Sequence, residues 1–267
     1  MLLLITALIQ SPVGLAFVAS FVAGMATAIG SLAVLFIRRL SRTAEDILLS
    51  TAAGIMLAAS IFSLILPGID YGTVQFGGKM PAVLVIIAGI SLGALMLWSL
   101  HHFVPHEHLH LGREGPEAAR IKRIWLFIFA ITLHNLPEGI SVGVGMMQEN
   151  EAAGAALALG IGLQNIPEGL AVSVALMTVG YRRSTAIWVG IASGLVEPVG
   201  GLFGGIAVWL AQPLLSLFLG VAAGAMLFVI SDEIIPETHR RDEYSHVTFA
   251  LLAGFSLMMF LDVVLAQ

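Results

Sequence analysis

Two nearly identical hexads carry the residues of this sequence that are best suited to chemistry. HNLPEG occupies 134–139, and QNIPEG occupies 164–169, thirty residues further along the chain. Both lie inside long apolar stretches, where an ionisable residue is costly and marks a functional site by default. His, Asn, Gln and Glu side chains offer the nitrogen and oxygen atoms that bind divalent cations. We therefore interpret the pair as two halves of one metal site.

Helical spacing places the polar residues of each hexad together. The glutamate lies four residues after the first donor and three after the asparagine, so all three side chains share one helix face. The proline before each glutamate removes a backbone N–H and displaces the helix from the carbonyl four residues earlier. Glu197-Pro198 repeats the carboxylate–proline pairing in the next apolar stretch. Three carboxylates, each beside a proline, are thus available: Glu138, Glu168 and Glu197.

A metal ion explains this residue set better than protonation does. Buried carboxyl groups can stay neutral by holding a proton, but that leaves the accompanying imidazole and amide groups without a role. A mixed set of His, Glu and amides favours Zn²⁺-like transition metals over Mg²⁺. Glu138 and Glu168 are the candidates to bridge two metal ions, because each has donor residues three and four positions earlier.

Two further sets of residues each have two interpretations. Met56 is either core packing or a thioether ligand, and from its surroundings in the sequence packing is the simpler choice. Asp232 and Glu233 lie close to Pro236 near the predicted end of a membrane span. They would form either an exit relay for the ion or the solvated end of the helix.

The composition is that of a protein that crosses a membrane many times. Of 267 residues, 58% are hydrophobic and 11% are charged, whereas a soluble domain has about 25% charged residues. The absence of Cys excludes disulfides and thiolate ligands. Because a helix needs about 20 apolar residues to cross a bilayer, the sequence predicts one all-α transmembrane domain over 1–267 with eight spans. These are 12–37, 45–68, 80–104, 122–147, 151–179, 184–210, 213–237 and 243–265.

The basic residues predict the orientation of the spans. Eleven of the 12 Lys and Arg residues fall in the connections after the first, third, fifth and seventh spans, and Lys79 is the exception. Since cytoplasmic connections are rich in Lys and Arg, we expect these connections in the cytoplasm and both termini outside it. The connection 105–121 is then a cytoplasmic loop. Its His106, His108 and His110 suit weak metal binding, although a solvated His-rich linker explains them equally well.

A weak internal repeat relates the first three spans to the last three. AAGIML at 52–57 matches AAGAML at 222–227, an offset of 170 residues that also aligns Gly24 with Gly194. Because the predicted topology gives the matched spans opposite directions, the pattern is typical of the inverted repeats of secondary transporters. Chance similarity between Ala- and Gly-rich helices is the alternative.

The sixth predicted span carries a stripe of small residues. Gly200, Gly201, Gly204 and Gly205 form two pairs with a spacing of four residues. Small residues let membrane helices approach closely, so the stripe predicts close structural packing. A smooth surface along which one helix bundle slides past another is the alternative interpretation.

Taken together, these features resemble the ZIP (Zrt/Irt-like) divalent-metal transporters, most closely the prokaryotic GufA-like branch. The similarity rests on the two hexads, Glu197, the eight spans and the His-bearing loop, and so covers nearly the whole chain. It implies a 3+2+3 helix arrangement and metal movement into the cytoplasm. It also implies an elevator-like motion of spans 1, 4, 5 and 6 past spans 2, 3, 7 and 8. The implied location is the inner membrane of a prokaryotic cell, as a multi-pass protein with both termini extracytoplasmic.

The resemblance further implies a binuclear site, and it makes Met56 a ligand rather than packing. The first metal would be held by Met56, His134, Glu138, Gln164 and Glu168. The second would be held by Asn135, Glu138, Asn165, Glu168 and Glu197. Family members can have His or Asp where this chain has Gln164 and Asn165, so the second position carries less negative charge here.

The expected function is transport of Zn²⁺, with Cd²⁺, Fe²⁺ and Mn²⁺ as further candidate substrates, and not an enzymatic reaction. An intramembrane metalloprotease is one alternative, but its HExxH motif is absent, as is the GxxxxGK[ST] loop of an ATP-driven pump. A proton-coupled permease for an organic solute is another, and it would not need the His, Asn and Gln donors. The expected partners are divalent metal ions and the lipid bilayer, with a homodimer as a further hypothesis and no nucleic acid.

Overall fold

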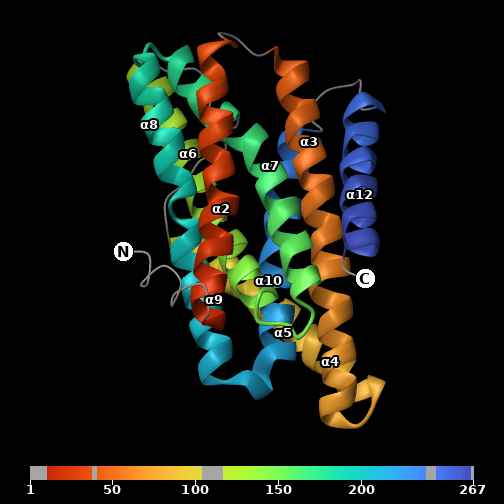
Figure 1. Cartoon of the computed structure of the whole chain (residues 1–267). Coiled ribbons are helices and arrows are strands. Elements are labelled where there is room, and N and C mark those ends of the chain that lie inside the picture. The colour runs from red at the N-terminus through yellow and green to blue at the C-terminus, as the bar shows by residue number, and fades with distance from the viewer. Residues whose placement is uncertain (1–10, 38–40, 104–116, 239–244, 266–267) are drawn as a thin grey trace.

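The protein is a bundle of long helices (Figure 1). The structure, a computed structural model, describes residues 11–37, 41–103, 117–238 and 245–265, and within these ranges it contains no strand. The helical elements are, in chain order, α2 (Pro12–Leu32), η1 (Ala33–Leu35), α3 (Arg42–Ala59), η2 (Ser60–Ile65), α4 (Leu66–Phe76), α5 (Lys79–Phe103), α6 (Glu117–Gly145), α7 (Glu151–Thr178), α8 (Arg183–Gly194), α9 (Glu197–Leu210), η3 (Gln212–Leu214), α10 (Leu215–Val229), η4 (Ile230–Ile234), α11 (Ile235–Thr238) and α12 (Ser245–Leu265).

Several helix ends follow directly from the local sequence. Ser11 caps α2 by accepting a hydrogen bond from the Gly14 N–H at 3.0 Å, and Pro12 occupies the first helical position. Asn150 caps α7 in the same way through its side-chain oxygen. Gly77 ends α4 with φ of 72°, a left-handed conformation that glycine adopts at no steric cost. The connections at these points are therefore short.

The predicted spans correspond to the helices, with differences at their ends. Seven stretches of the described residues are long and apolar enough to cross a membrane. The second runs to Phe76 instead of ending at residue 68, because α3, η2 and α4 continue one another. The fourth predicted span lies in α6, which begins at Glu117 and has 29 residues. This helix carries several charged residues in its first turns and is not among the seven stretches. The count of eight spans therefore stays a prediction.

The sixth predicted span is not one continuous helix. It consists of α8, which ends at Gly194, and α9, which begins at Glu197. Pro198 has no N–H to donate to the carbonyl four residues earlier, and its ring clashes with that carbonyl in a regular helix. The predicted span 184–210 corresponds to the membrane-length stretch Arg183–Leu210, and the interruption lies directly before Glu197-Pro198. The break places the Glu197 side chain at the first turn of a helix.

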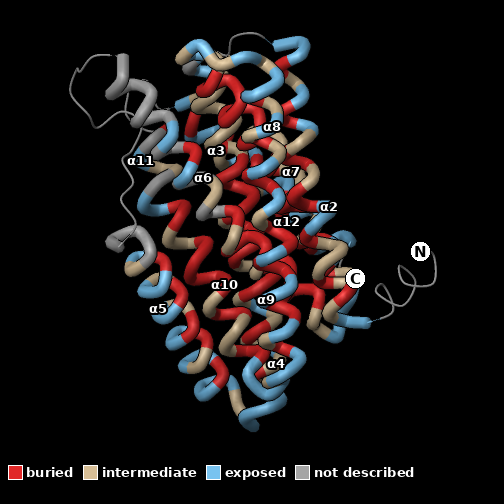
Figure 2. The backbone as a smooth tube through the Cα atoms, turned by 90° about the vertical axis from the view of Figure 1, so that its left-hand side faces the viewer, coloured by how far each residue is buried: buried red, intermediate tan, exposed pale blue. Residues whose placement is uncertain are grey.

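Many large apolar side chains lie on the outside of the bundle, unlike in a soluble protein. Figure 2 shows buried backbone through the centre of the bundle and exposed backbone along its outside. The exposed residues include Phe36 (89% exposed) and Val74 (87%), whereas Ser20, Thr27 and Ser60 are fully buried. Apolar side chains that face outward need a lipid environment. The prediction of an all-α membrane protein is thus confirmed.

The predicted elevator-like motion divides the helices into two groups. The site group comprises α2, α6, α7, α8 and α9, which pack on one another. The flanking group comprises α3 with α12, and α10 with α4 and α5, two packed sets that both contact η2. Figure 1 shows α2, α8 and α9 on one side of the bundle and α3 with α12 on the other. The groups meet mainly where α7 lies against α3 and α12, and where α6 lies against α10.

Glycine contacts in the flanking group come in matched pairs. A Cβ atom on Gly54 of α3 would overlap the Leu251 carbonyl oxygen of α12, and one on Gly254 of α12 would overlap a carbonyl oxygen of α3. Gly93 of α5 and Gly224 of α10 face each other in the same manner. The offset of 170 residues relates Gly54 to Gly224. These equivalent contacts favour the predicted inverted repeat.

The same offset relates two further features. Gly24 of α2 and Gly194 of α8 lie against each other's carbonyl oxygens, a reciprocal contact that a two-fold axis between the repeats would require. The two π-helices, η2 and η4, begin at Ser60 and Ile230, and a proline follows each of them. The helices that the offset relates thus each contain a π-helical turn, and the two turns lie at equivalent positions.

The glycine stripe on α9 packs entirely within the site group. Gly200 and Gly204 face backbone atoms of α6, whereas Gly201 and Gly205 face Ser20 and other atoms of α2. The structural interpretation of the stripe is therefore confirmed. The alternative, a sliding surface between helix bundles, stays a hypothesis, and the observed contacts of the stripe are with α2 and α6.

The close glycine contacts predict a loss of stability on enlargement. In Gly54→Ala the new methyl group would overlap the backbone of α12, and overpacking of this kind costs about 1–3 kcal/mol. We expect a lower midpoint of thermal unfolding in detergent. Gly78→Ala is the control, because its Cβ would have Pro81 Cδ as its nearest neighbour, at 3.7 Å. Equal midpoints for the two variants would contradict the packing argument.

Candidate metal centre

Three buried carboxylates from three helices of the site group form the centre of the site. Glu138 of α6, Glu168 of α7 and Glu197 of α9 are 2%, 7% and 0% exposed. They lie close enough to repel one another electrostatically. None of the described Lys or Arg residues lies in the middle of a helix. A proton or a metal cation can supply a counter-charge for the three glutamates.

The last residue of each hexad brings the helices together. A Cβ on Gly139 would overlap the Glu197 carbonyl oxygen, and a Cβ on Gly169 would overlap the Thr27 carbonyl oxygen. Gly139 thus lets α6 approach α9, and Gly169 lets α7 approach α2. Only glycine permits such close approach of backbones. The hexads therefore supply both the polar side chains and the packing that gathers them.

Asn165 organises one side of the cluster. Its Nδ2 donates to Glu197 Oε1 at 2.7 Å and to the Ala23 carbonyl at 2.9 Å. Its Oδ1 accepts a hydrogen bond from Gln164 Nε2 at 2.6 Å. Gln164 and Asn165 are both fully buried or nearly so. These hydrogen bonds fix the orientation of the second hexad toward α9 and α2.

Three acceptor atoms at the centre have no hydrogen-bond partner. Among the described residues, Asn135 Oδ1, Glu138 Oε2 and Glu197 Oε2 are buried without a donor, although Asn135 Nδ2 donates to the Ser193 carbonyl at 2.9 Å. A buried acceptor without a partner typically costs about 1–3 kcal/mol. All three atoms are oxygens that could bind a cation, so the site fits a bound metal ion chemically.

The described side chains alone do not form a complete coordination shell. Within the described residues, no group of three His, Asp or Glu side chains is close enough to hold a metal ion. His134 lies in α6, but its side chain is outside the described part of the structure. A metal at this site would therefore depend on the amide oxygens of both hexads, or would draw the carboxylates together.

The remaining predicted site residues lie apart from this cluster or outside the described residues. Met56 is 1% exposed in α3, so it would reach the site from the flanking group. Asp232 is exposed in η4, and the side chain of Glu233, next to it, is not described. The histidines His106, His108 and His110 fall in 104–116, outside the described residues.

Sequence reasoning missed the partners that hold the amides. The carbonyl groups of Ala23 and Ser193 accept hydrogen bonds from Asn165 and Asn135, and a carbonyl leaves no signal in residue types. Thr27 of α2 is fully buried, and its hydroxyl has no partner among the described residues. Ser31 of the same helix donates to the Gly169 carbonyl of the second hexad at 3.2 Å. Small polar residues in an apolar span were the available signal for the participation of α2.

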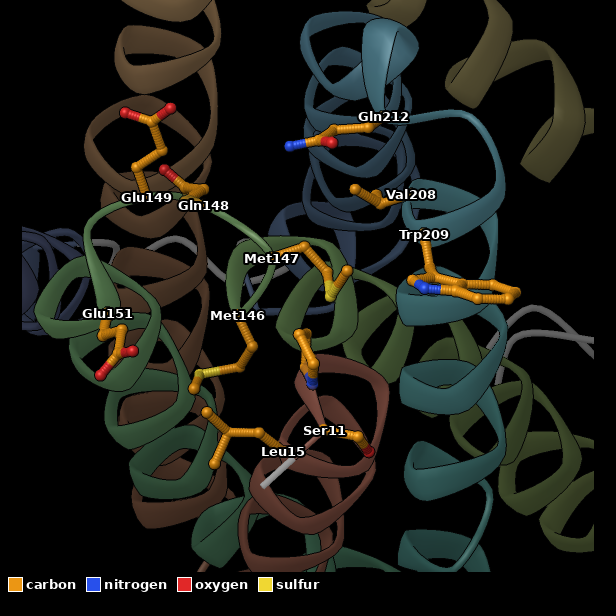
Figure 3. Close-up of a pocket in the computed structure, with 11 residues that line it drawn as sticks. Ser11, Leu15, Met146, Met147, Gln148, Glu149, Glu151, Val208, Trp209 and Gln212 are labelled. Atoms are coloured by element: carbon orange, nitrogen blue, oxygen red, sulfur yellow. The ribbon is translucent and has the colours of Figure 1, made fainter. Parts of the chain in front are cut away.

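A separate pocket of about 450 Å³ opens at one end of the site group (Figure 3). It lies between the start of α2, the end of α9 and the loop 146–150 that joins α6 to α7. Met146, Met147 and Trp209 contribute apolar surface, and Glu149 and Glu151 contribute carboxylates. The sequence did not predict this pocket.

Comparison with known proteins gives a consistent result. The profile of the family described as ZIP Zinc transporter matches residues 99–262. The chain is 45% identical over 240 residues to "Zinc transporter ZIPB" of Bordetella bronchiseptica, an alignment that covers 90% of this chain and 78% of that protein. It is 42% identical over 249 residues to "Zinc transporter GufA" of Myxococcus xanthus, covering 93% and 98%. It is 32% identical over 254 residues to "Zinc transporter ZupT" of Stenotrophomonas maltophilia, covering 92% and 94%.

The amide network predicts the effect of removing its central residue. In metal-free protein, Asn165→Ala would leave Glu197 Oε1 buried without its donor, at a cost of about 1–3 kcal/mol. We expect a lower midpoint of thermal unfolding in a chelator-treated sample. Asn135→Ala is the comparison, since it removes one hydrogen bond to a neutral carbonyl and also an unpartnered oxygen. A loss as large in Asn135→Ala would argue against the network.

Proposed function

Because the chain belongs to the ZIP zinc transporter family, we propose that it carries Zn²⁺ across a membrane through the carboxylate cluster of α6, α7 and α9. The observation that carries this proposal is the set of unpartnered buried oxygens on Asn135, Glu138 and Glu197. In a soluble protein such atoms could bind water, but in a membrane core they need a cation or a proton. The relatives named as zinc transporters support the cation.

Two adjacent metal positions share the carboxylates of Glu138 and Glu168. The first position uses Met56, His134, Glu138, Gln164 and Glu168. The second uses Asn135, Glu138, Asn165, Glu168 and Glu197. Support for the second position comes from the Asn165–Glu197 hydrogen bond, which places an amide and a carboxylate of that set in direct contact. Cd²⁺, Fe²⁺ and Mn²⁺ have ligand preferences close enough to Zn²⁺ to be further substrates.

Transport proceeds into the cytoplasm by movement of the site group past the flanking group. Support comes from the closest glycine-to-backbone contacts, as at Gly139, Gly169 and Gly254, which join helices of the same group. Between the groups, a Cβ on Gly160 of α7 would meet only side-chain atoms, chiefly those of Met258 on α12. Side-chain contacts can be exchanged during sliding more easily than backbone contacts.

The position of Met56 gives this movement a chemical consequence. Met56 belongs to the flanking group, whereas the other predicted ligands belong to the site group. Movement of the site group would therefore separate the metal from the Met56 thioether. Loss of one soft ligand weakens the first position at the stage where the ion must leave.

The function is tested by zinc uptake into proteoliposomes. We expect wild-type protein to transport Zn²⁺, and Glu138→Gln and Glu168→Gln to lower the initial rate by at least about tenfold, since even indirect metal-site changes cost that much. Glu151→Gln is the matched control, because it removes an exposed carboxylate from the helix that carries Glu168. Absence of uptake by wild-type protein would leave an organic-solute permease or a metalloprotease to be tested.

The second metal position is tested by restoring a carboxylate to it. Asn165→Asp adds negative charge beside Glu197. We therefore expect a lower thermal stability without metal, and a larger number of zinc ions bound with high affinity per protein than in wild type. Isothermal titration calorimetry on purified protein measures both affinity and stoichiometry. Asn165→Ala serves as the uncharged control. An unchanged stoichiometry in Asn165→Asp would place the second ion elsewhere.

A further inference from the structure

A polar contact joins the two helix groups away from the metal centre. The side-chain amide of Gln148 donates to the backbone carbonyl of Ser63, with 3.2 Å between Nε2 and the oxygen. Gln148 lies in the loop between α6 and α7 of the site group, and Ser63 lies in η2 of the flanking group. The predicted topology places this contact on the extracytoplasmic side, because Gln148 follows the fourth span.

The Ser63 carbonyl lies where the regular helical pattern is interrupted. Pro67, four residues further on, has no N–H for the hydrogen bond that a regular helix would form there. In the π-helical turn around Ser63, the Leu66 N–H donates to the Ile61 carbonyl, five residues back. Gln148 thus donates to a carbonyl that cannot form the usual bond to the residue four positions on.

The acceptor is held firmly to the flanking group. Ser63 Oγ lies 2.9 Å and 2.7 Å from the two carboxylate oxygens of Asp262 on α12 and donates its hydrogen to that carboxylate. Asp262 is only 5% exposed. A hydrogen bond to a buried carboxylate is among the stronger ones. The segment around Ser63 is thereby fixed to α12.

The donor is held equally firmly to the site group. The loop 146–150 continues the end of α6 with hydrogen bonds from Met146 N to Val142 O (2.9 Å), and from Gln148 N to Gly145 O (3.3 Å). Asn150 then starts α7 as its cap. Figure 3 shows Gln148 at the edge of the pocket, against the helix in the colour of the α3–α4 segment. The Gln148 amide therefore has a defined position relative to both groups.

We propose that Gln148 is a latch residue that holds the extracytoplasmic ends of the two groups together in the state described here. The proposal rests on the two-group movement proposed above, because a hydrogen bond between groups that slide past each other must break in each cycle. Release of Gln148 from the Ser63 carbonyl then accompanies the opening of the extracytoplasmic side for metal entry. Gln148 acts as a positioning residue and does not contact the metal ion.

A single introduced cysteine reports the opening directly, because the chain has no Cys of its own. Met258 is fully buried and contacts Gly160 across the boundary between the groups, so Met258→Cys reacts only when the groups separate. In zinc-free proteoliposomes, an externally added impermeant maleimide should label Met258→Cys about fivefold faster in a Gln148→Ala background. That factor corresponds to the loss of ~1 kcal/mol for one hydrogen bond.

Matched variants separate the latch from other effects. Gln148→Glu keeps the length but, when ionised, offers no donor, so it should also speed labelling. Gln212→Ala removes another amide that lines the same pocket and should leave the rate unchanged. The proposal would be overturned if adding Gln148→Ala or Gln148→Glu to the Met258→Cys protein did not raise the labelling rate above that of Met258→Cys alone. Zinc uptake by wild-type protein, measured in the same preparation, tests transport independently, so normal uptake with unchanged labelling rejects the latch alone.

Discussion

The structure depends on the burial of three carboxyl groups in a membrane core where none of the described Lys or Arg residues lies beside them. Glu138, Glu168 and Glu197 come from three helices and lie within electrostatic reach of one another. An apolar core would be more stable without them, because desolvation of unpaired charge is costly. A proton or a metal cation can compensate their charge. The buried oxygens of Asn135, Glu138 and Glu197 that accept no hydrogen bond among the described residues are suited to such a cation.

The backbone resolves the problem of building such a site between helices. Gly139 and Gly169 let α6 and α7 touch the backbones of α9 and α2, and these contacts bring the glutamates together. Carbonyl groups of Ala23 and Ser193 then orient the amides of the hexads. The prolines serve a different purpose, since each one breaks the hydrogen-bond ladder of its helix where polar groups are needed. Packing and chemistry are thus encoded in the same six residues.

The sequence predicted those parts of the molecule that depend on residue type. Repetition of the hexads identified the site, and hydropathy identified the membrane helices, because both are local properties. The break between α8 and α9 was missed, although Pro198 was recognised as a partner of Glu197. The carbonyl partners of the amides and the contact of Gln148 with Ser63 could not be predicted, since they depend on which helices pack together. The direction in which the glycine stripe of α9 faces was open for the same reason.

The long helices of the flanking group combine flexibility and rigidity in a way that suits transport. The π-turns η2 and η4 occupy corresponding positions, and Pro67 and Pro236 follow them. π-turns inside α-helices occur frequently at functional sites. By the predicted topology, η2 lies on the extracytoplasmic side of the hexads and η4 on the cytoplasmic side. Between them, the close glycine contacts of α3 with α12 and of α5 with α10 leave little room for a change of shape.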